Sequence, residues 1–175
     1  ENNNKNSASS ERISVNDGIK ASIGLAGVNI APYARVAAIN SGSGTLHITL
    51  VDGTENRLTG GGDCPALQTG GNLVIDGSGS LAASAQVNSA IKANGLNTII
   101  KSGSISALCG EYYGISLGGT ENNFVISENA CVYSGHGFNK TPVNENTSDE
   151  SLPVNSNETR HFRIPNINAK KGSAI

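Results

Sequence analysis

Three of the four tyrosines are candidates for sugar recognition. Tyr112 and Tyr113 are adjacent, and Tyr133 lies further along the chain. An exposed aromatic ring can stack on the apolar C–H surface of a sugar, while nearby hydroxyl and amide groups orient the polar groups. We therefore expect Tyr112, Tyr113 and Tyr133 to contact a ligand. The alternative is that at least one ring packs against a neighbouring part of the chain.

Three carboxylates are candidates for a metal site. Asp52 and Asp76 each precede a glycine within similar short strings, and Glu55 follows shortly after Asp52. If Asp52 and Asp76 occupy matching positions in a repeat, the like charges repel unless they are solvated or bridged by a cation. Oxygen ligands suit Ca²⁺ or Mg²⁺, so we expect a calcium site at Asp52, Glu55 and Asp76. The alternative is a pair of solvated turn aspartates.

The remaining reactive side chains give no assignable catalytic set. The three histidines have neither metal-ligand spacing nor an adjacent carboxylate motif, and no pair of carboxylates can be nominated for sugar cleavage. Three cysteines without a CxxC pair argue against structural zinc. Cys109 and Cys131 lie 22 residues apart, and they form either a disulfide or two small buried thiols.

An internal repeat must position these candidates. Four similar strings recur along the chain, and their aliphatic anchors are Ile39, Leu67, Ile91 and Ile115. The second and third intervals between anchors are equal, at about 24 residues, and the first interval is four residues longer. Repeats of this length are typical of architectures in which each unit stacks on the next.

A second string supports the same period. Residues 77–83 recur one such interval later as residues 101–107, and residues 51–53 are followed after the same interval by the similar string 75–77. The four extra residues of the longest repeat must then fall between Ile39 and Val51. We place them at 41–44, as a widened turn.

The repeats predict a fold built entirely from strands. Runs such as 47–51, 72–75 and 97–100 are aliphatic and β-branched and are bounded by Gly, Asn, Asp or Ser. A period of about 24 residues is too short for a helical hairpin or a propeller blade. We predict an all-β, single-stranded parallel β-solenoid (a right-handed β-helix) of about five coils, about 24 residues per coil, with a loop-rich C-terminal segment.

The domain boundaries follow from composition. We expect a flexible segment at 1–11, solenoid coils at 12–138, and an Asn- and Ser-rich loop at 139–175 whose end is able to return as a C-terminal cap. One polar residue follows each anchor, which predicts a ladder along one outward face. The ladder residues are Asn40, Gln68, Lys92 and Ser116. The ladder either lines a polar groove or reflects ordinary strand alternation.

Charge and hydropathy exclude several classes of function. The 12 basic and 14 acidic side chains nearly cancel, so no overall field draws the chain to nucleic acid. No stretch approaches the roughly 18 consecutive apolar residues of a transmembrane helix, and we expect no membrane insertion. The polar opening without an initiator Met leads us to expect a processed or excised fragment with any targeting signal upstream.

Four strings, at 27–30, 48–58, 73–81 and 90–93, carry a resemblance to a known family. Over about residues 25–120 the sequence resembles the right-handed β-helix modules labelled carbohydrate-binding in surface proteins of clostridia and other gut bacteria. It implies a secreted or cell-surface, non-catalytic module, which in some members binds acidic polysaccharide with calcium at Asp-rich turns. This chain departs from the family where Asn88-Ser89 and Tyr112-Tyr113 replace the expected Asp-Asp-Gly turns.

These observations lead to an expected function with two alternatives. The expected function is that of a bacterial polysaccharide-binding or adhesive surface module whose partner is a polysaccharide or other glycan, alongside further domains of the same surface protein. The first alternative is a structural stalk or spacer of a larger adhesin. The second is a polysaccharide-degrading β-helix enzyme, which needs converging carboxylates and a cationic clamp.

Overall fold

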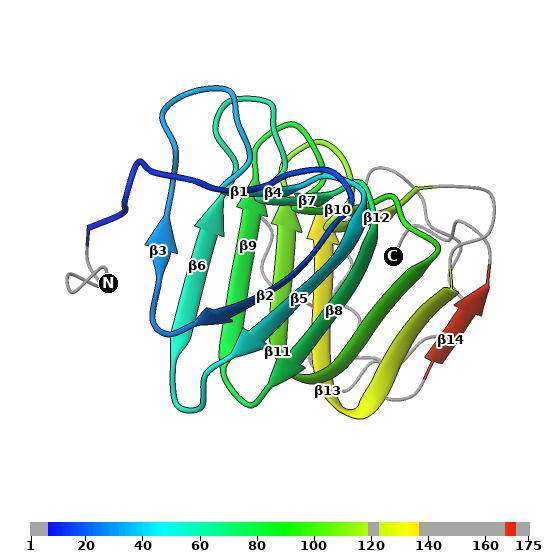
Figure 1. Ribbon diagram of the computed structural model, residues 1–175. Helices are drawn as coiled ribbons and strands as arrows, with labels where there is room; N and C mark the ends of the chain where they lie inside the picture. The colour runs from blue at the N-terminus through cyan, green and yellow to red at the C-terminus, as the bar shows by residue number, and fades with distance from the viewer. Residues whose placement is uncertain (1–6, 119–122, 137–166, 171–175) are drawn as a thin grey trace.

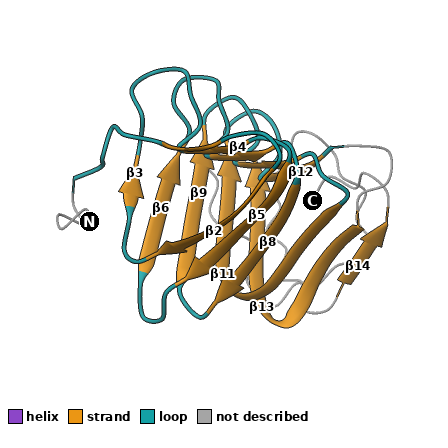
Figure 2. Cartoon of the chain, in the orientation of Figure 1, coloured by secondary structure: helices purple, strands orange, loops and turns teal. Residues whose placement is uncertain are grey.

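The computed structural model describes residues 7–118, 123–136 and 167–170. Within these residues the chain forms strands and no helix, and the strands wind into a three-sided solenoid (Figures 1 and 2). The predicted segment at 139–175 lies outside the described residues except for its strand at 167–170. Of the predicted segment at 1–11, residues 1–6 also lie outside them.

Each side of the solenoid is a stack of parallel strands, one from each coil. The first side contains β1 (Ile13–Val15), β4 (Ile39–Ser41), β7 (Leu67–Thr69), β10 (Ile91–Ala93) and β12 (Ile115–Leu117). The second contains β2 (Ile19–Leu25), β5 (Gly44–Leu50), β8 (Asn72–Gly77) and the first halves of β11 (Asn97–Cys109) and β13 (Asn123–His136). The third contains β3 (Asn29–Ile30), β6 (Glu55–Thr59), β9 (Ser80–Ala85) and the second halves of β11 and β13.

The predicted anchors form one continuous column on the first side. Ile39 pairs with Leu67, Leu67 with Ile91, and Ile91 with Ile115, and each side chain is at most 1% exposed. The polar residue after each anchor is in register as well, so the predicted ladder is confirmed as an arrangement of residues. The stacking of like on like therefore follows the repeat in the sequence.

The position of the four extra residues was predicted wrongly. The sequence offset between paired residues of successive coils decreases step by step along the chain. It is 28 between β4 and β7, 27 between β5 and β8, 25 between β6 and β9, and 24 between β7 and β10. The turn at 42–44 thus absorbs one extra residue, the turn at 51–54 absorbs two, and the loop at 60–66 absorbs one. Turns tolerate such insertions because strand pairing on either side is unchanged.

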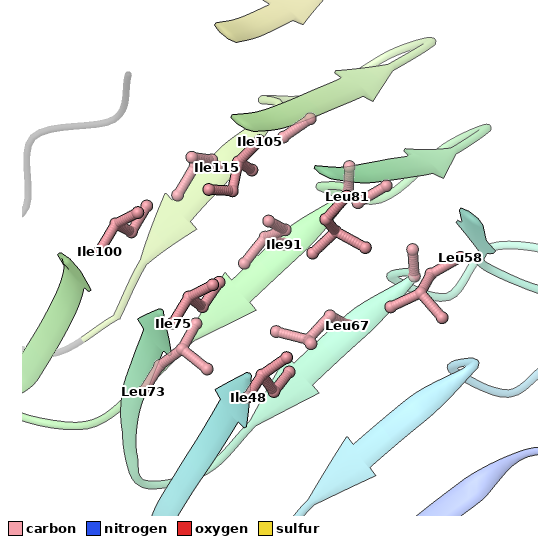
Figure 3. Packing of buried hydrophobic residues seen from close by; sticks show 14 of the residues in the cluster. Ile48, Leu58, Leu67, Leu73, Ile75, Leu81, Ile91, Ile100, Ile105 and Ile115 are labelled. Carbon is pink, nitrogen blue, oxygen red and sulfur yellow. The ribbon is translucent and has the colours of Figure 1, made fainter. Parts of the chain in front are cut away.

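The core is made of inward-facing aliphatic columns (Figure 3). On the second side, Ile48, Ile75, Ile100 and Ile126 stack in register and are at most 1% exposed. Burying one such side chain contributes roughly 1.5–3 kcal/mol. Because each coil covers only its neighbours, this contribution depends on the coils above and below.

Glycine is required where a corner of one coil lies against the backbone of the coil before it. Gly77 has a φ of 91°, and a Cβ there would overlap the carbonyl group of Leu50. Gly53 has a φ of 66°, yet a Cβ there would meet nothing within 4 Å. The first glycine is needed both for its backbone angle and for space, and the second only for its angle.

One strand departs from the parallel pattern at the last coil. β14 (Ile167–Lys170) pairs antiparallel with β13 across Asn123–Ile126, and it covers that part of the final edge. The other end of the stack begins with a shorter contact, because Ser9 bridges Ile30 of β3. None of the described residues forms a helix long and apolar enough to cross a membrane.

Candidate functional site

The loops that join the third side to the first side form a row along the stack. They comprise residues 31–38, 60–66, 86–90 and 110–114, and we call this row the loop ridge. Backbone hydrogen bonds join successive loops: Gly61 donates to Val36 (3.0 Å), and Ala90 donates to Tyr113 (3.3 Å). Figure 2 shows these loops side by side at one edge of the solenoid.

The loop ridge carries three of the four tyrosines. Tyr33 is 94% exposed, Tyr112 57% and Tyr113 38%. The loops of Tyr33 and Tyr112 belong to the first and fourth coils, so they lie roughly 14 Å apart along the stack, or three strand spacings. The sequence analysis did not identify Tyr33 as a candidate, because its loop precedes the anchors that defined the repeat.

Tyr133 does not belong to the loop ridge. It lies in β13 opposite Ser106, on the outward face of the third side, and its side chain is half-buried. The structure therefore places Tyr112 and Tyr113 together in one loop and Tyr133 on a strand of the next coil.

The polar groups around the exposed tyrosines have mixed charge. Arg35 Nε lies 3.9 Å from Asp63 Oδ1, and these side chains are 81% and 52% exposed. Glu111, also exposed, precedes the tyrosine pair. A surface ion pair of this kind adds little stability. These side chains remain in water, where they can meet the polar groups of a ligand.

The geometry assumed for the metal site is wrong. Asp76 pairs with Thr49, not with Asp52, because residue n pairs with n + 27 here rather than with n + 24. The carboxylate of Asp52 instead accepts a hydrogen bond from Ser78 (2.7 Å). Among the described residues, no group of three or more His, Cys, Asp or Glu side chains is placed to hold a metal ion, and Glu55 is an exposed residue of β6.

The same offset creates a polar cluster that the sequence did not reveal. His47 Nε2 lies 2.6 Å from Asp76 Oδ2, and Thr49 donates to Asp76 Oδ1 at 2.9 Å. Burial raises the pKa of the Asp76 carboxyl, but the hydrogen bonds from His47 and Thr49, with the nearby charge of Lys101, lower it by more. The sequence would have indicated this cluster had the extra residues been placed correctly.

The His47 cluster does not have the arrangement of a catalytic triad. A serine- or threonine-based nucleophile must donate its hydroxyl proton to the base. Here Thr49 donates to Asp76, and the Nε2 atom of His47 contacts the same carboxylate. The cluster joins β5 to β8 on the outward face of the second side.

Asparagines form a second polar row on that face. The backbone N–H of Asn97 donates to Asn72 Oδ1 at 2.9 Å, and Asn123 Nδ2 lies 3.4 Å from Asn97 Oδ1. Stacked amides of this kind stabilise repeating strands, because each coil bonds the next. Their bonds within the stack give the row a structural role.

Of the two alternatives for Cys109 and Cys131, the structure excludes the disulfide. Cys109 pairs with His136 and Cys131 with Ser104, so the two cysteines are five positions apart along neighbouring strands, or roughly 16 Å. A disulfide requires the Cα atoms to be within about 7 Å. Both thiols are free, and Cys109 is buried with its Sγ 2.8 Å from the carbonyl oxygen of Asn88.

Comparison with known proteins gives no relative for this chain. No family model, no curated protein and no solved structure matches it significantly. The solenoid is therefore established from the strand pairing of the chain itself. No comparison supports the resemblance to clostridial modules, which rests only on the sequence strings.

Proposed function

We propose that this chain is a non-catalytic module, secreted or displayed on a cell surface, that binds an extended polysaccharide along the loop ridge. The observation that carries the proposal is the gathering of Tyr33, Tyr112 and Tyr113 in one row of loops, with all three rings exposed. Aromatic rings in water are the usual surface for the apolar faces of sugars.

The spacing of the rings favours a long ligand over a single sugar. Tyr33 and Tyr112 lie roughly 14 Å apart along a rigid stack, which is further than one sugar ring can reach. A polysaccharide that contacts both tyrosines binds the second one without a further loss of translational and rotational entropy, because the two rings are held at a fixed distance. We therefore expect affinity to rise with the length of the oligosaccharide.

A stalk or spacer is the second candidate function. Small outward side chains on β9 and β11 support it, because they give a ligand little to contact on that part of the third side. These side chains are Ser80, Ala82, Ser84, Ser104 and Ser106. A spacer has no need for exposed tyrosines, so this candidate predicts no glycan binding at all.

A glycan and polysaccharide array tests the proposal. The wild-type chain is expected to bind at least one polysaccharide equally well with calcium and with a chelator. The Tyr112→Ala, Tyr113→Ala double variant is expected to bind at least about tenfold more weakly, and Tyr33→Ala to weaken only long ligands.

The control variant is Leu96→Ala. Leu96 is 66% exposed but lies at a different corner of the solenoid, between β10 and β11. If Leu96→Ala loses as much affinity for the polysaccharide as the tyrosine variants do, the loop ridge is not the binding surface. An array on which the wild-type chain binds nothing would favour the spacer.

A further inference from the structure

One loop of the ridge, at 110–114, is held at both ends by backbone hydrogen bonds to the coil before it, and we call it the tyrosine loop. Gly110 donates to the carbonyl oxygen of Ala85 at 3.0 Å, and Ala90 donates to the carbonyl oxygen of Tyr113 at 3.3 Å. These two bonds fix where the loop begins and ends. The course of the loop between them depends on a further contact.

A thiol makes that contact in the middle of the tyrosine loop. The Sγ atom of Cys109 accepts a hydrogen bond from the backbone N–H of Tyr112 at 2.9 Å, and it donates to the carbonyl oxygen of Asn88 at 2.8 Å. A thiol has one hydrogen to donate and lone pairs that accept, so both contacts form at the same time. Cys109 thus joins the tyrosine loop to the loop at 86–90.

The environment of Cys109 maintains both contacts. The side chain is 0% exposed, so water does not compete for the sulfur. Burial also raises the pKa of the thiol. At neutral pH the sulfur therefore keeps the proton that it donates to Asn88.

The preceding coil provides an internal comparison. Cys109 pairs in register with Ala85, and Ala107, two positions earlier, pairs with Ala83. Alanine is thus retained at one inward position of the two strands and replaced by cysteine at the other. The loop that follows Ala85 contains no aromatic residue, whereas the loop that follows Cys109 contains two. The thiol occurs in the coil whose loop carries the tyrosine pair.

We infer that Cys109 is a positioning residue of the polysaccharide site, and that its thiol holds Tyr112 and Tyr113 in the orientation that stacks on sugars. The inference rests on the proposed function and gives the thiol a role in affinity beyond its burial. A loop that is already ordered loses less conformational entropy when a ligand binds. When the thiol is removed, the ligand must order the loop, and affinity falls.

Amide exchange of the free protein tests the structural half of the inference. The Tyr112 amide should be protected in the wild type and in Cys109→Ser, because a hydroxyl also donates and accepts. In Cys109→Ala it should exchange at least about threefold faster. Rapid exchange in the wild type, or an unchanged rate in Cys109→Ala, would overturn the inference.

Affinity gel electrophoresis with a polysaccharide that retards the wild type tests the functional half. Cys109→Ala should bind about three- to tenfold more weakly, and Cys109→Ser should bind as the wild type does. Because alanine already occupies the matched position of the preceding coil, Cys109→Ala is expected to fold. Equal affinity of Cys109→Ala and the wild type would overturn the inference, as would a loss in Cys109→Ser as large as in Cys109→Ala.

The matched control for lost packing is Ile105→Val. Ile105 is a buried residue of β11, as Cys109 is, but it pairs with Leu81 within the strands of the third side. The loss of one methyl group should lower Tm and leave the affinity for the polysaccharide unchanged. If Ile105→Val weakens binding as much as Cys109→Ala does, the thiol acts through stability alone and the inference fails.

The same gels separate the inference from the proposed function. If no polysaccharide retards the wild type, the proposed function fails, and the role inferred for Cys109 fails with it. If the Tyr112→Ala, Tyr113→Ala variant loses binding while Cys109→Ala keeps it, the loop ridge still binds polysaccharide and only the inference is wrong.

Discussion

Replacing Asn56 with Leu separates two physical accounts of the core. Asn56 is 1% exposed and occupies an inward position of β6 that pairs with Leu81. If apolar burial alone decided the stability of this column, Leu at this position would stabilise the stack. Its hydrogen bonds lead us to expect the opposite.

The expected magnitude follows from the partners of the Asn56 amide. Its Oδ1 accepts from the N–H groups of Gly27 (2.9 Å) and Val28 (3.1 Å), and its Nδ2 donates to the carbonyl oxygen of Ser80 (3.0 Å). Leaving two such N–H groups without an acceptor costs about 4 kcal/mol in total. Burying the larger apolar side chain returns about 2 kcal/mol. We expect Asn56→Leu to be less stable by the difference, about 2 kcal/mol.

Urea denaturation followed by far-UV circular dichroism measures this change. The matched control is Ile105→Leu, since Ile105 pairs with Leu81 in the same column, and its cost should stay below about 1.5 kcal/mol. Amide exchange should also accelerate at Gly27 and Val28 in Asn56→Leu. The reasoning is refuted if Asn56→Leu is as stable as the wild type with both amides still protected.

Three further predictions concern single residues. The pKa of Asp76 is lowered from 3.8, so its contribution to stability is present above that pH and is lost as the pH falls through the lowered pKa. As the pH is lowered, the Asp76→Asn variant should therefore lose less free energy of unfolding than the wild type. The same pH dependence of stability in both proteins would contradict this. Gly77→Ala should cost at least about 2 kcal/mol more than Gly53→Ala, because only the former meets backbone atoms; equal melting temperatures would count against that packing. Burial raises the pKa of Cys109, so iodoacetamide should modify Cys64 faster than Cys109 at neutral pH, and faster reaction at Cys109 would reject its buried placement.

The fold could be predicted from the sequence wherever successive coils place a residue in the same structural position. Ile39, Leu67, Ile91 and Ile115 occupy the same place in successive coils, so selection for one kind of side chain leaves a visible period. The last three of these anchors are evenly spaced, and the sequence identifies their coils correctly.

Turn lengths limited what the sequence could say about the candidate sites. The pairing of Asp52 with Asp76 assumed one insertion, but the extra residues are divided among three turns. A strand shifted by a few positions changes every partner, so Asp76 meets His47 and Thr49 instead. The cysteine pair failed for a related reason, because residue n pairs with n + 27 in this part of β11 and β13, which places Cys131 opposite Ser104, far from Cys109.

The loop ridge was only partly predictable because loops carry no strand alternation. Tyr112 and Tyr113 attracted notice as a pair in a chain with few aromatic residues. Tyr33 had no such neighbour, and only the stacking of residues 31–38 with the later loops brings it into the same row. The sequence thus indicated the chemistry of the ridge but not its extent.

The most direct test of the account is affinity gel electrophoresis of the wild-type chain and the Tyr112→Ala, Tyr113→Ala double variant through gels that contain individual polysaccharides. We predict that at least one polysaccharide retards the wild type, that it does so with or without calcium, and that the double variant migrates as in a gel without polysaccharide. Equal migration of both proteins in every gel would contradict the proposal that the loop ridge binds polysaccharide.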